Sequence, residues 1–522
     1  MQGDVSPPQS PIGRIEFMNE TFDVVVAGAG PVGLMLACEL RLGGAEVLVV
    51  ERLTEPDMTI KAGAINAPTS LAFYRRGMLP ELLEQQNATV QRIRAAGMFP
   101  NSAGERLPIA GHFGGIVLRM DEIDFDDPVF AELGPGAEAV LVAQQAIEAI
   151  LARRAAELGI EVRRGVELTE FDDDETGVTV HLGDSTVRAD WLVGCDGGRS
   201  TVRKLAGFDF PGLGPEITGH QAVVEMTGAE GLRPGWNTTE TGIYTNGPTP
   251  GRILTVELDG PPADRTTPVT AAELQAGLRA VSGVPVEITA VHSATRFTDN
   301  TRQVTDYRKG RVLLAGDAAH VHSPFGGQGL NLGIGDAVNL GWKLAAVVRG
   351  DAREALLDTY TAERHPVGAW VLEWTRAQVA LMRLDQRSKA LREVMTDLLA
   401  TRDGATTIFK RISGVLHRYD LGGGHDLIGA VAPDIELSDG SRLGAHFADG
   451  RAILLDLADS PELRAIAGPW SDLVRVVTAK PVAPRDLSAM LIRPDGYVSW
   501  AANSGERNGL DNALRRWFGD KS

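Results

Sequence analysis

The chain has 522 residues, of which 43% are hydrophobic and 23% charged. This is the balance of a globular protein, with a length that suits about three or four domains. The 69 acidic and 51 basic residues give a net charge of −18, which argues against a nucleic-acid-binding surface and against unassisted docking on an anionic membrane. Cys38 and Cys195 are the two cysteines, which excludes a disulfide framework and indicates a reducing compartment, so we expect a cytoplasmic protein.

The N-terminal region predicts an arm followed by a βαβ unit. Residues 1–20 are rich in Pro and Ser and lack the regions of a signal peptide, so we expect a mobile arm. Residues 22–27 form an apolar, β-branched run typical of a buried strand, and residues 34–42 have helical apolar spacing. A second buried strand follows at residues 46–50.

The middle of the chain changes character twice. Residues 80–136 indicate short strands and turns. The next expected elements are a helix at 144–158 and strands at 160–166, 178–182 and 191–193. Residues 208–297 alternate strand-like segments with Pro and Gly turns and lack long helices, which predicts a mostly antiparallel sheet.

The remaining elements complete an α/β pattern. A buried strand at 311–314 precedes a Gly-rich loop and a helix at 330–348, and residues 354–399 are helical with an interruption at Pro366. Residues 402–424 read as a connector. The tail resembles a small α/β domain, with strands expected at 452–457, 473–477, 489–492 and 498–500.

The spacing of Gly28, Gly30 and Gly33 is that of a dinucleotide-binding loop. In such a loop the first glycine permits the tight turn, the second lets the backbone approach a pyrophosphate, and the third lets the helix pack on the strand. Glu51 ends the second strand 23 residues after Gly28, close to the position expected for an acid that binds a ribose hydroxyl. A purely structural Gly-rich turn is the alternative, and the motif by itself does not separate NAD from FAD.

Motifs elsewhere in the chain carry a family resemblance. The segment RVLLAGDAAHVHSPFGGQGLN at 311–331 resembles the second FAD motif of the flavin-dependent aromatic hydroxylases of the para-hydroxybenzoate hydroxylase type, and CDGGRSTVR at 195–203 resembles their other shared motif. The segments YTAERHPVG at 360–368 and LIRPDGYVSW at 491–500 are similar to the actinobacterial branch that oxidises aromatic polyketides and phenols.

The resemblance implies one tightly but non-covalently bound FAD. Asp317 is then the ribityl-binding acid, while Arg199 and Arg203 supply positive charge for phosphate. The expected cofactor-binding residues are Gly28, Gly30, Val32, Gly33, Glu51, Arg52, Lys61, Gln144, Leu168, Asp196, Asp317, Gly329, Leu330 and Asn331. Lys61 and Pro68 depart from the family, which usually has arginine at the first position and often at the second.

The resemblance also implies the activity. NADPH or NADH acts as a transient reductant, and a flavin C4a-hydroperoxide then transfers one oxygen atom of O2 to a polycyclic aromatic or phenolic substrate. Hydroxylation is expected, with Baeyer–Villiger oxygenation or oxidative rearrangement as the alternative. The backbone of Pro324, Gly326 and Gly327 is expected to shape the oxygen-transfer site. A dehydrogenase or oxidase without oxygen insertion and a non-enzymatic dinucleotide sensor are the rival readings.

The substrate pocket is expected between this loop and the 208–297 sheet. The candidate pocket residues are His220, Trp236, Tyr244 and Arg252. His320 and His322 suggest a structural role, and no metal site is expected, because no further ligands accompany them. The tail contains no cysteine, so packing or dimerisation is its expected role, in a protein that is a monomer or a homodimer.

Together the patterns and the resemblance predict an α/β protein with a Rossmann-like FAD-binding fold and an inserted, mostly antiparallel sheet. The resemblance implies that the tail is thioredoxin-like. The expected boundaries are an arm at 1–20, an FAD-binding domain at 21–207 and 298–400, a substrate sheet domain at 208–297, a connector at 401–431 and a tail at 432–522. Residues 80–136 are expected to contribute partly to the substrate side.

Overall fold

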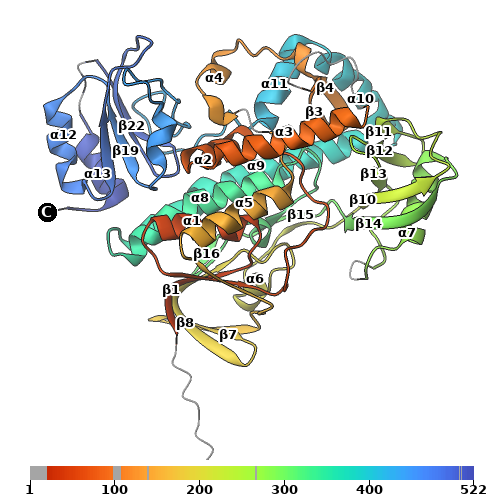
Figure 1. Ribbon diagram of the computed structural model, residues 1–522, viewed down its shortest axis with the longest axis horizontal. Coiled ribbons are helices and arrows are strands. Elements are labelled where there is room, and N and C mark those ends of the chain that lie inside the picture. Colours follow the sequence, from red (N-terminus) through yellow and green to blue (C-terminus); the bar gives the residue numbers. More distant parts are fainter. Residues whose placement is uncertain are drawn as a thin grey trace, which may run out of the picture.

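The computed structural model describes residues 20–97, 107–137, 140–264, 267–504, 506 and 508–521. The arm expected at residues 1–20 therefore lies, apart from Glu20, outside the described residues. Figure 1 shows a central part built of a sheet and long helices, with a second sheet at one end and a small α/β domain at the other.

The central sheet confirms the predicted βαβ unit. Its strand order is β16-β17-β8-β1-β2-β5, and β1 pairs in parallel with both β2 and β8. The path consists of β16 (Arg308–Lys309), β17 (Val312–Leu314), β8 (Ser185–Gly194), β1 (Thr21–Ala27), β2 (Val47–Glu51) and β5 (Glu161–Arg164), with β6 (Glu170–Asp174) and β7 (Gly177–Leu182) at its side. The apolar run of β1 is buried on both faces, as the absence of alternation predicts.

Long helices pack tightly over this sheet (Figure 1). They are α1 (Pro31–Leu42), α5 (Gln144–Glu157), α8 (Gly329–Val348) and α9 (Asp358–Met382). Small residues let α1 and α8 touch: a Cβ atom at Gly333 would lie 2.5 Å from Val32 Cγ2, and one at Gly341 would lie 2.3 Å from Glu39 Cβ. Both N-termini, which carry the positive ends of the helix dipoles, are thus fixed with respect to each other.

The second sheet is antiparallel as predicted, but one helix was missed. The strands are β11 (Gly235–Thr238), β12 (Gly242–Asn246), β13 (Arg252–Glu257), β10 (Thr218–Thr227) and β14 (Glu287–Phe297), in this spatial order. The expectation that 208–297 lacks long helices is wrong, because α7 (Ala271–Ser282) covers one face of the sheet. Thr270 caps α7 and Gly283 ends it, signals that the dense turns around them obscured.

Three other segments differ from the predictions. Residues 80–136 contain most of a long helix, α3 (Leu79–Ala95), whose few buried residues give a weak apolar pattern. The connector at 402–424 contains α11 (Arg402–Ile412). The helix at 354–399 is not interrupted at Pro366 but between α9 and α10 (Gln386–Leu399). Buried neighbours on both sides of Pro366 hold α9 together despite the lost backbone hydrogen bond.

The tail domain, residues 432–521, has strands close to the predicted positions. Its sheet has the order β20-β19-β21-β22, made of β19 (Ala452–Asp456), β20 (Val474–Thr478), β21 (Leu487–Ile492) and β22 (Val498–Asn503). The helices are α12 (Pro461–Ala467) and α13 (Leu510–Phe518). Trp342 of α8 packs against Trp517 and Phe518 of α13, so the tail shares a core with the central part.

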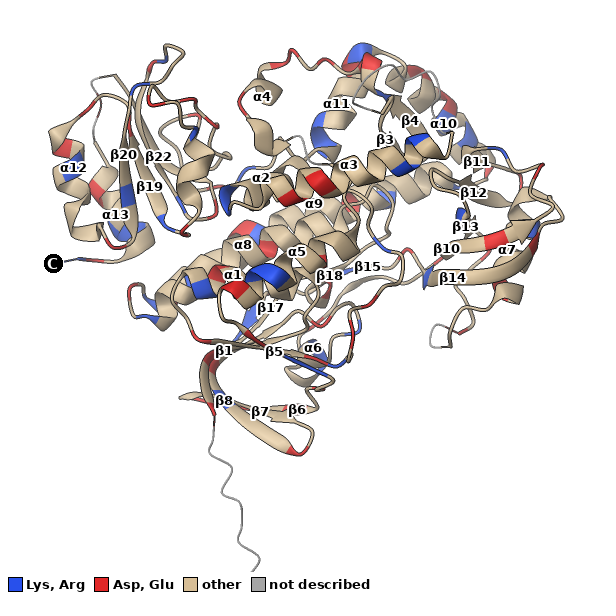
Figure 2. Ribbon diagram, in the orientation of Figure 1, with Lys and Arg blue, Asp and Glu red and all other residues tan. Residues whose placement is uncertain are grey.

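Shorter elements connect these layers. They are α2 (Ala67–Arg75), α4 (Pro128–Ala131), α6 (Thr201–Leu205), β3 (Ile109–Phe113), β4 (Ile116–Arg119), β9 (Gly212–Leu213), β15 (Thr301–Gln303) and β18 (His320–Val321). Figure 2 shows acidic and basic residues interspersed over the helices and the tail domain, so the net negative charge is not gathered in one part of the described chain.

Candidate flavin and substrate site

The first glycine loop has the geometry that its spacing predicts. A Cβ atom at Gly28 would lie 2.5 Å from Cys195 O, and one at Gly33 would lie 1.9 Å from Gly28 O, so both positions pack against backbone. A Cβ atom at Gly30 would meet nothing within 4 Å. Gly30 is thus the open position, at the N-terminus of α1, where a pyrophosphate can approach the backbone.

Glu51 lies beside this loop. Its carboxylate accepts hydrogen bonds from the backbone N–H groups of Ala29 and Leu53, each at 2.9 Å. The acid at the end of β2 is therefore held against the glycine turn, where a ribose hydroxyl can reach it. Arg52, next to it, is exposed.

The second loop, residues 324–331, also contains an open glycine. Gly326 and Gly327 have φ angles of +85° and +62°, a region that favours glycine. A Cβ atom at Gly327 would meet nothing within 4 Å, and Pro324 beside it is exposed. Asn331 fixes the loop from α8, since its Nδ2 donates to Gly327 O at 2.8 Å and its Oδ1 accepts from the backbone N–H of Asn66 at 2.9 Å.

Asp317 is left available at the start of α8. It is exposed, and none of the described residues donates a hydrogen bond to its carboxylate. A Cβ atom at Gly329, the first residue of α8, would lie 4.0 Å from Asp317 Oδ1. The side chain therefore stands beside the helix N-terminus and the open second loop, where the hydroxyl groups of a sugar alcohol can bind it.

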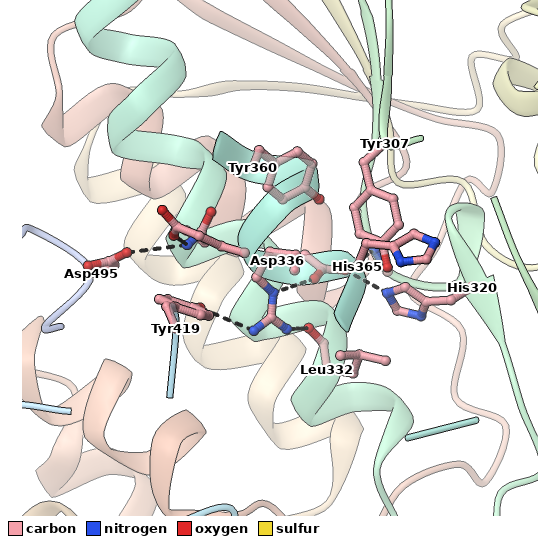
Figure 3. Close-up of polar contacts among 12 residues, drawn as sticks. Tyr307, His320, Leu332, Asp336, Tyr360, His365, Tyr419 and Asp495 are labelled. Atoms are coloured by element: carbon pink, nitrogen blue, oxygen red, sulfur yellow. Dashed lines mark hydrogen bonds and ion pairs between the residues drawn. The ribbon is translucent and has the colours of Figure 1, made fainter. Parts of the chain in front are cut away.

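A buried network that the sequence reasoning missed holds the Asp317 turn. Asp336 accepts hydrogen bonds from the backbone N–H of Gly316 at 3.0 Å and from Arg364 Nε at 2.8 Å, and it lies 2.7 Å from His320 Nε2 (Figure 3). Burial alone would raise the pKa of Asp336, but His320 and Arg364 outweigh it and hold that pKa below its usual value. The available signal was a charged residue in the apolar 330–348 pattern.

The polar side chains of the Asp196 motif form hydrogen bonds within the protein. Asp196 Oδ2 accepts hydrogen bonds from the N–H groups of Thr201 and Val202 at the start of α6. Arg203, expected to supply charge for phosphate, donates to the carbonyl groups of Gly198 and Ala318 and stacks on a phenylalanine ring. The guanidinium of Arg203 is therefore buried and bonded to backbone carbonyl groups. This corrects the expectation that Arg203 supplies positive charge for a phosphate.

The other expected cofactor residues lie around the two loops. Gln144 begins α5, where its N–H donates to Ala62 O at 2.9 Å and its side chain donates to Glu148. Lys61 is exposed and pairs with Asp57 at 2.8 Å. Leu168 and Leu330 are buried in the central core, and Val32 fills the space between Gly316 and Gly333.

The sheet separates the four candidate pocket residues. Side chains alternate between the faces of a strand, and His220 and Tyr244 point to the α7 side. There His220 Nε2 lies 2.8 Å from Glu273 of α7, and the Tyr244 hydroxyl accepts from the backbone N–H of Arg233. Both residues therefore lie on the face away from the second loop, which corrects their expected place in the pocket.

Trp236 and Arg252 occupy the face toward the second loop. The Trp236 ring lies 6.2 Å from the ring of Phe325, centroid to centroid. A Cβ atom at Gly63 would lie 3.5 Å from Arg252 Nη1. Burial lowers the pKa of Arg252, and its guanidinium has no hydrogen-bond or ion-pair partner among the described residues. This cation is thus free to meet an electronegative group of a ligand.

Two features are absent from the part of the chain that the structure describes. Within it, no group of three or more His, Cys, Asp or Glu side chains could hold a metal ion. No helix in the same residues combines the length and the apolar character that crossing a membrane requires.

Comparisons with known proteins identify the family. Residues 21–375 match the FAD binding domain family, and residues 425–520 match the family described as aromatic-ring hydroxylase, C-terminal. The chain therefore belongs to the FAD-dependent aromatic-ring hydroxylases. It is an FAD-dependent monooxygenase, and NADPH or NADH is the reductant typical of this family.

Two relatives and one solved structure give the degree of similarity. The chain is 41% identical to a 12-dehydrotetracycline 5-monooxygenase/anhydrotetracycline 6-monooxygenase of Streptomyces rimosus over 95% of this chain and 99% of the relative. It is 40% identical to a rifampicin monooxygenase of Streptomyces venezuelae over 95% of this chain and 99% of the relative. The OxyS anhydrotetracycline hydroxylase from Streptomyces rimosus matches with a TM-score of 0.83 and 39% identity, covering 96% of this chain and 100% of that chain.

The residues present fit FAD. Two loops have glycine positions that a Cβ atom would fill, each at the N-terminus of a long helix, and two carboxylates flank them. When bound, FAD supplies the two-electron chemistry and the activation of O2. The residues that would hold it are the backbone N–H groups at Gly30 and Gly327 and the N-termini of α1 and α8, whose dipoles favour bound negative charge.

Proposed function

We propose that this monooxygenase inserts one oxygen atom of O2, most readily by hydroxylation, into a polycyclic aromatic substrate of the polyketide type. The observation that carries the proposal is that the 324–331 loop, with its open position at Gly327, lies against the face of the second sheet that bears Trp236 and Arg252. The names of the relatives, which refer to anhydrotetracycline and rifampicin, support a large aromatic substrate.

We assign the two halves of FAD to the two loops. The Gly28–Gly33 loop and Glu51 hold the adenosine and pyrophosphate half, and Asp317 binds the ribityl chain. The N-terminus of α8, at Gly329, faces the flavin ring. Residues 21–207 and 298–400 form the FAD-binding domain in this proposal, and residues 208–297 form the substrate side. The open position at Gly30 and the unbonded carboxylate of Asp317 support this direction of binding.

Arg252 is proposed to orient the substrate. Phenol and enol groups of aromatic polyketides are weak acids, and a guanidinium stabilises their deprotonated oxygens by charge-assisted hydrogen bonds. A ring made electron-rich in this way is a better acceptor of an electrophilic oxygen atom. Trp236 and Phe325 supply flat apolar surface on the same side of the sheet as that cation.

The test uses the purified holoenzyme with anhydrotetracycline, rifampicin and phenol as probes. We expect NADPH oxidation that rises when one of the polycyclic probes is added, and a product that carries one atom of oxygen-18 when the gas is labelled O2. NADPH oxidation or substrate oxidation without label in the product would instead establish a dehydrogenase or oxidase. Absence of bound flavin would instead favour a non-enzymatic dinucleotide sensor.

The structure of the same product distinguishes hydroxylation from Baeyer–Villiger oxygenation. A hydroxylated ring and a Baeyer–Villiger lactone have equal mass but different carbon skeletons, so the NMR spectrum of the product separates them. We also place the enzyme in the cytoplasm, where NADPH and NADH are available and where thiols such as Cys38 stay reduced.

A further inference from the structure

Gln378 of α9 is a fully buried amide that joins two loops far apart in the sequence. Its Oε1 accepts a hydrogen bond from the backbone N–H of Gly114 at 3.0 Å. Its Nε2 donates to the carbonyl of Phe325 at 3.2 Å. Gly114 lies in the turn between β3 and β4, and Phe325 lies in the 324–331 loop.

The two partners determine which residue type can stand at this position. A backbone N–H can only donate and a carbonyl can only accept, so the side chain between them must offer one acceptor and one donor. A carboxylate would repel the carbonyl of Phe325, and a methionine of similar shape would leave both backbone groups unpaired. The orientation of the Gln378 amide follows from the same two partners.

Both loops also touch α9 through their backbone. A Cβ atom at Gly326 would lie 2.7 Å from Gln378 Nε2, and one at Gly114 would lie 3.0 Å from Leu381 Cδ2. Both glycines have a positive φ angle, +85° and +54°, so each is doubly restricted to glycine. The two loops therefore rest on neighbouring turns of one helix.

The turn at Gly114 carries a wall of the proposed substrate site. A Cβ atom at Gly115 would lie 2.1 Å from Trp236 Nε1, so the turn presses against the indole. The His112 ring lies 4.8 Å from the Trp236 ring. Burial lowers the pKa of His112 to about 4, so a neutral imidazole packs against the indole. The position of the turn thus sets the position of the Trp236 surface.

We propose that Gln378 is a positioning residue that fixes the spacing between the substrate wall at Gly114–Trp236 and the oxygen-transfer loop at Gly326–Gly327. This inference rests on the proposed function of the loop. A fixed spacing holds the aromatic ring of the substrate close to the oxygen-transfer loop, so that the oxygen atom enters the ring and is not released as hydrogen peroxide.

The consequence concerns where two electrons go. NADPH supplies two electrons as a hydride, and in productive turnover one atom of O2 enters the substrate while the other leaves as water. If the ring lies too far away, the same two electrons and two protons reduce O2 to hydrogen peroxide. Loss of the Gln378 bridge therefore changes the partition between oxygenated product and peroxide more than the rate of NADPH oxidation.

The first experiment needs no substrate. Amide hydrogen exchange is measured on the holoenzyme of the wild type, of Gln378→Met and of Thr375→Val. Thr375 is buried one turn earlier on α9, and its hydroxyl donates only within its own helix, to Leu372 O, so its variant controls for disturbance of α9. We expect exchange about tenfold faster in segments 113–116 and 324–327 of Gln378→Met, together and without a rise elsewhere, as for one lost buried hydrogen bond per loop.

The second experiment measures coupling with a polycyclic probe that the wild type accepts. In Gln378→Met the ratio of product to NADPH consumed should fall several-fold and peroxide should rise, while the dissociation constant for FAD stays unchanged. Unchanged exchange in the two segments, or a uniform rise over the chain, would overturn the positioning role. If the wild type oxygenates no probe, the proposed function fails, and the exchange result still decides whether the bridge exists.

Discussion

At the residue scale, two aspartates near the start of α8 have opposite surroundings. Asp336 is fully buried and bonds Gly316, His320 and Arg364. Asp317, one residue after Gly316, is exposed and receives no hydrogen bond from the described residues. The first carboxylate holds the turn in place, and the second is presented outward by that turn. The exposed acid of the 311–331 motif therefore depends on a buried acid that lies beyond the end of that motif.

Asp317→Ala is expected to weaken FAD binding. The ribityl hydroxyls lose a charge-assisted partner worth ~1.5–3 kcal/mol, so the dissociation constant of FAD should rise roughly tenfold to hundredfold. Reconstitution of the apoprotein, followed by flavin fluorescence, measures this constant. Asp184→Ala, in the exposed turn between β7 and β8, serves as the control and should bind FAD like the wild type. Equal affinity of both variants would place the ribityl chain elsewhere.

The two cysteines are expected to resist alkylation in the folded enzyme. Burial raises the pKa of Cys38 to about 12 and raises the pKa of Cys195 well above its ordinary value. The reactive thiolate is therefore scarce near pH 8, because both thiols stay protonated until the pH is far higher. Treatment with iodoacetamide at pH 8 should leave NADPH oxidation intact, and mass spectrometry should find both thiols unmodified. Rapid modification accompanied by inactivation would contradict this expectation.

At the scale of the element, the two glycine loops divide crowded positions from open ones. Gly28, Gly33 and Gly326 are crowded, since a Cβ atom there would meet neighbouring protein atoms at less than 3.0 Å. Gly30 and Gly327 face open space. Crowded glycines let chain segments approach each other, and open glycines let a ligand approach the backbone. The glycine needed for folding and the glycine needed for binding can therefore be separated by mutation.

Gly327→Val should uncouple the enzyme. The φ angle of +62° is strained for a β-branched residue, and the new side chain would enter the open space beside Pro324. NADPH should still be oxidised, while peroxide replaces most of the oxygenated product. NADPH, peroxide and product are measured together on folded, FAD-loaded protein.

A matched glycine controls for the backbone strain. Gly183 has a φ angle of +66° and open surroundings, but it lies in the turn between β7 and β8. Gly183→Val should lose comparable stability and keep the wild-type ratio of product to NADPH. Wild-type coupling in Gly327→Val would show that this loop does not shape the oxygen-transfer site.

At the scale of the whole molecule, buried ion pairs join the tail domain to the central helices. Arg493 of the tail lies 2.7 Å from Glu363 of α9 and 2.5 Å from Asp495, and Lys343 of α8 lies 3.0 Å from Glu363. All four side chains are almost completely buried. Charges in such a place are tolerated only when every member is paired. The tail therefore contributes to the stability of α8 and α9. Tyr497 of the tail also stacks on Tyr419, whose hydroxyl accepts a hydrogen bond from Arg364, the residue that bonds Asp336 (Figure 3).

Arg493→Met should destabilise the protein in a pH-dependent way. Burial alone would raise the pKa of Glu363, but Arg493 and Lys343 outweigh it and hold that pKa well below its usual 4.5. Glu363 thus stabilises the wild type above about pH 4.5, and this contribution is lost as the pH falls toward the lowered pKa. Without Arg493 the buried carboxylates of Glu363 and Asp495 lose their shared cation, while Lys343 stays beside Glu363. Negative charge in the buried cluster is then incompletely compensated, so we expect a loss of about 3–5 kcal/mol at pH 7.

The pH dependence supplies the check. In the variant, acid protonates an incompletely compensated carboxylate and relieves its penalty, so the gap between the two stabilities should narrow as the pH falls from 7 toward 4.5. Below pH 4.5 the wild type also begins to lose the contribution of Glu363, and the gap should narrow further. Urea unfolding at each pH measures both stabilities. Arg475→Met on β20 is the control: its pair with Asp449 has both side chains more than a third exposed, so the variant should show a small difference at every pH. A constant gap between wild type and Arg493→Met would contradict the role of Glu363.

The sequence by itself determined the class of this protein. The βαβ unit, the glycine spacing, the motif around Asp317 and the strands of the tail depend on spacing within short stretches, where side-chain periodicity and backbone freedom act locally. Those stretches could therefore be interpreted one at a time. The helices α3, α7 and α11 were missed for the same reason, because their apolar patterns are weak or lie among turns.

Only the tertiary structure decided which residues meet. His220 and Arg252 lie on paired strands, yet one faces α7 and the other the second loop, because a shift of one residue reverses the face. α9 continues past Pro366 because residues on both sides of the proline are packed in the core, although proline by itself favours a helix break. Gln378 reaches a turn 264 residues earlier in the chain. Such contacts depend on how the layers of the fold stack. A local sequence pattern does not encode which distant segments come together.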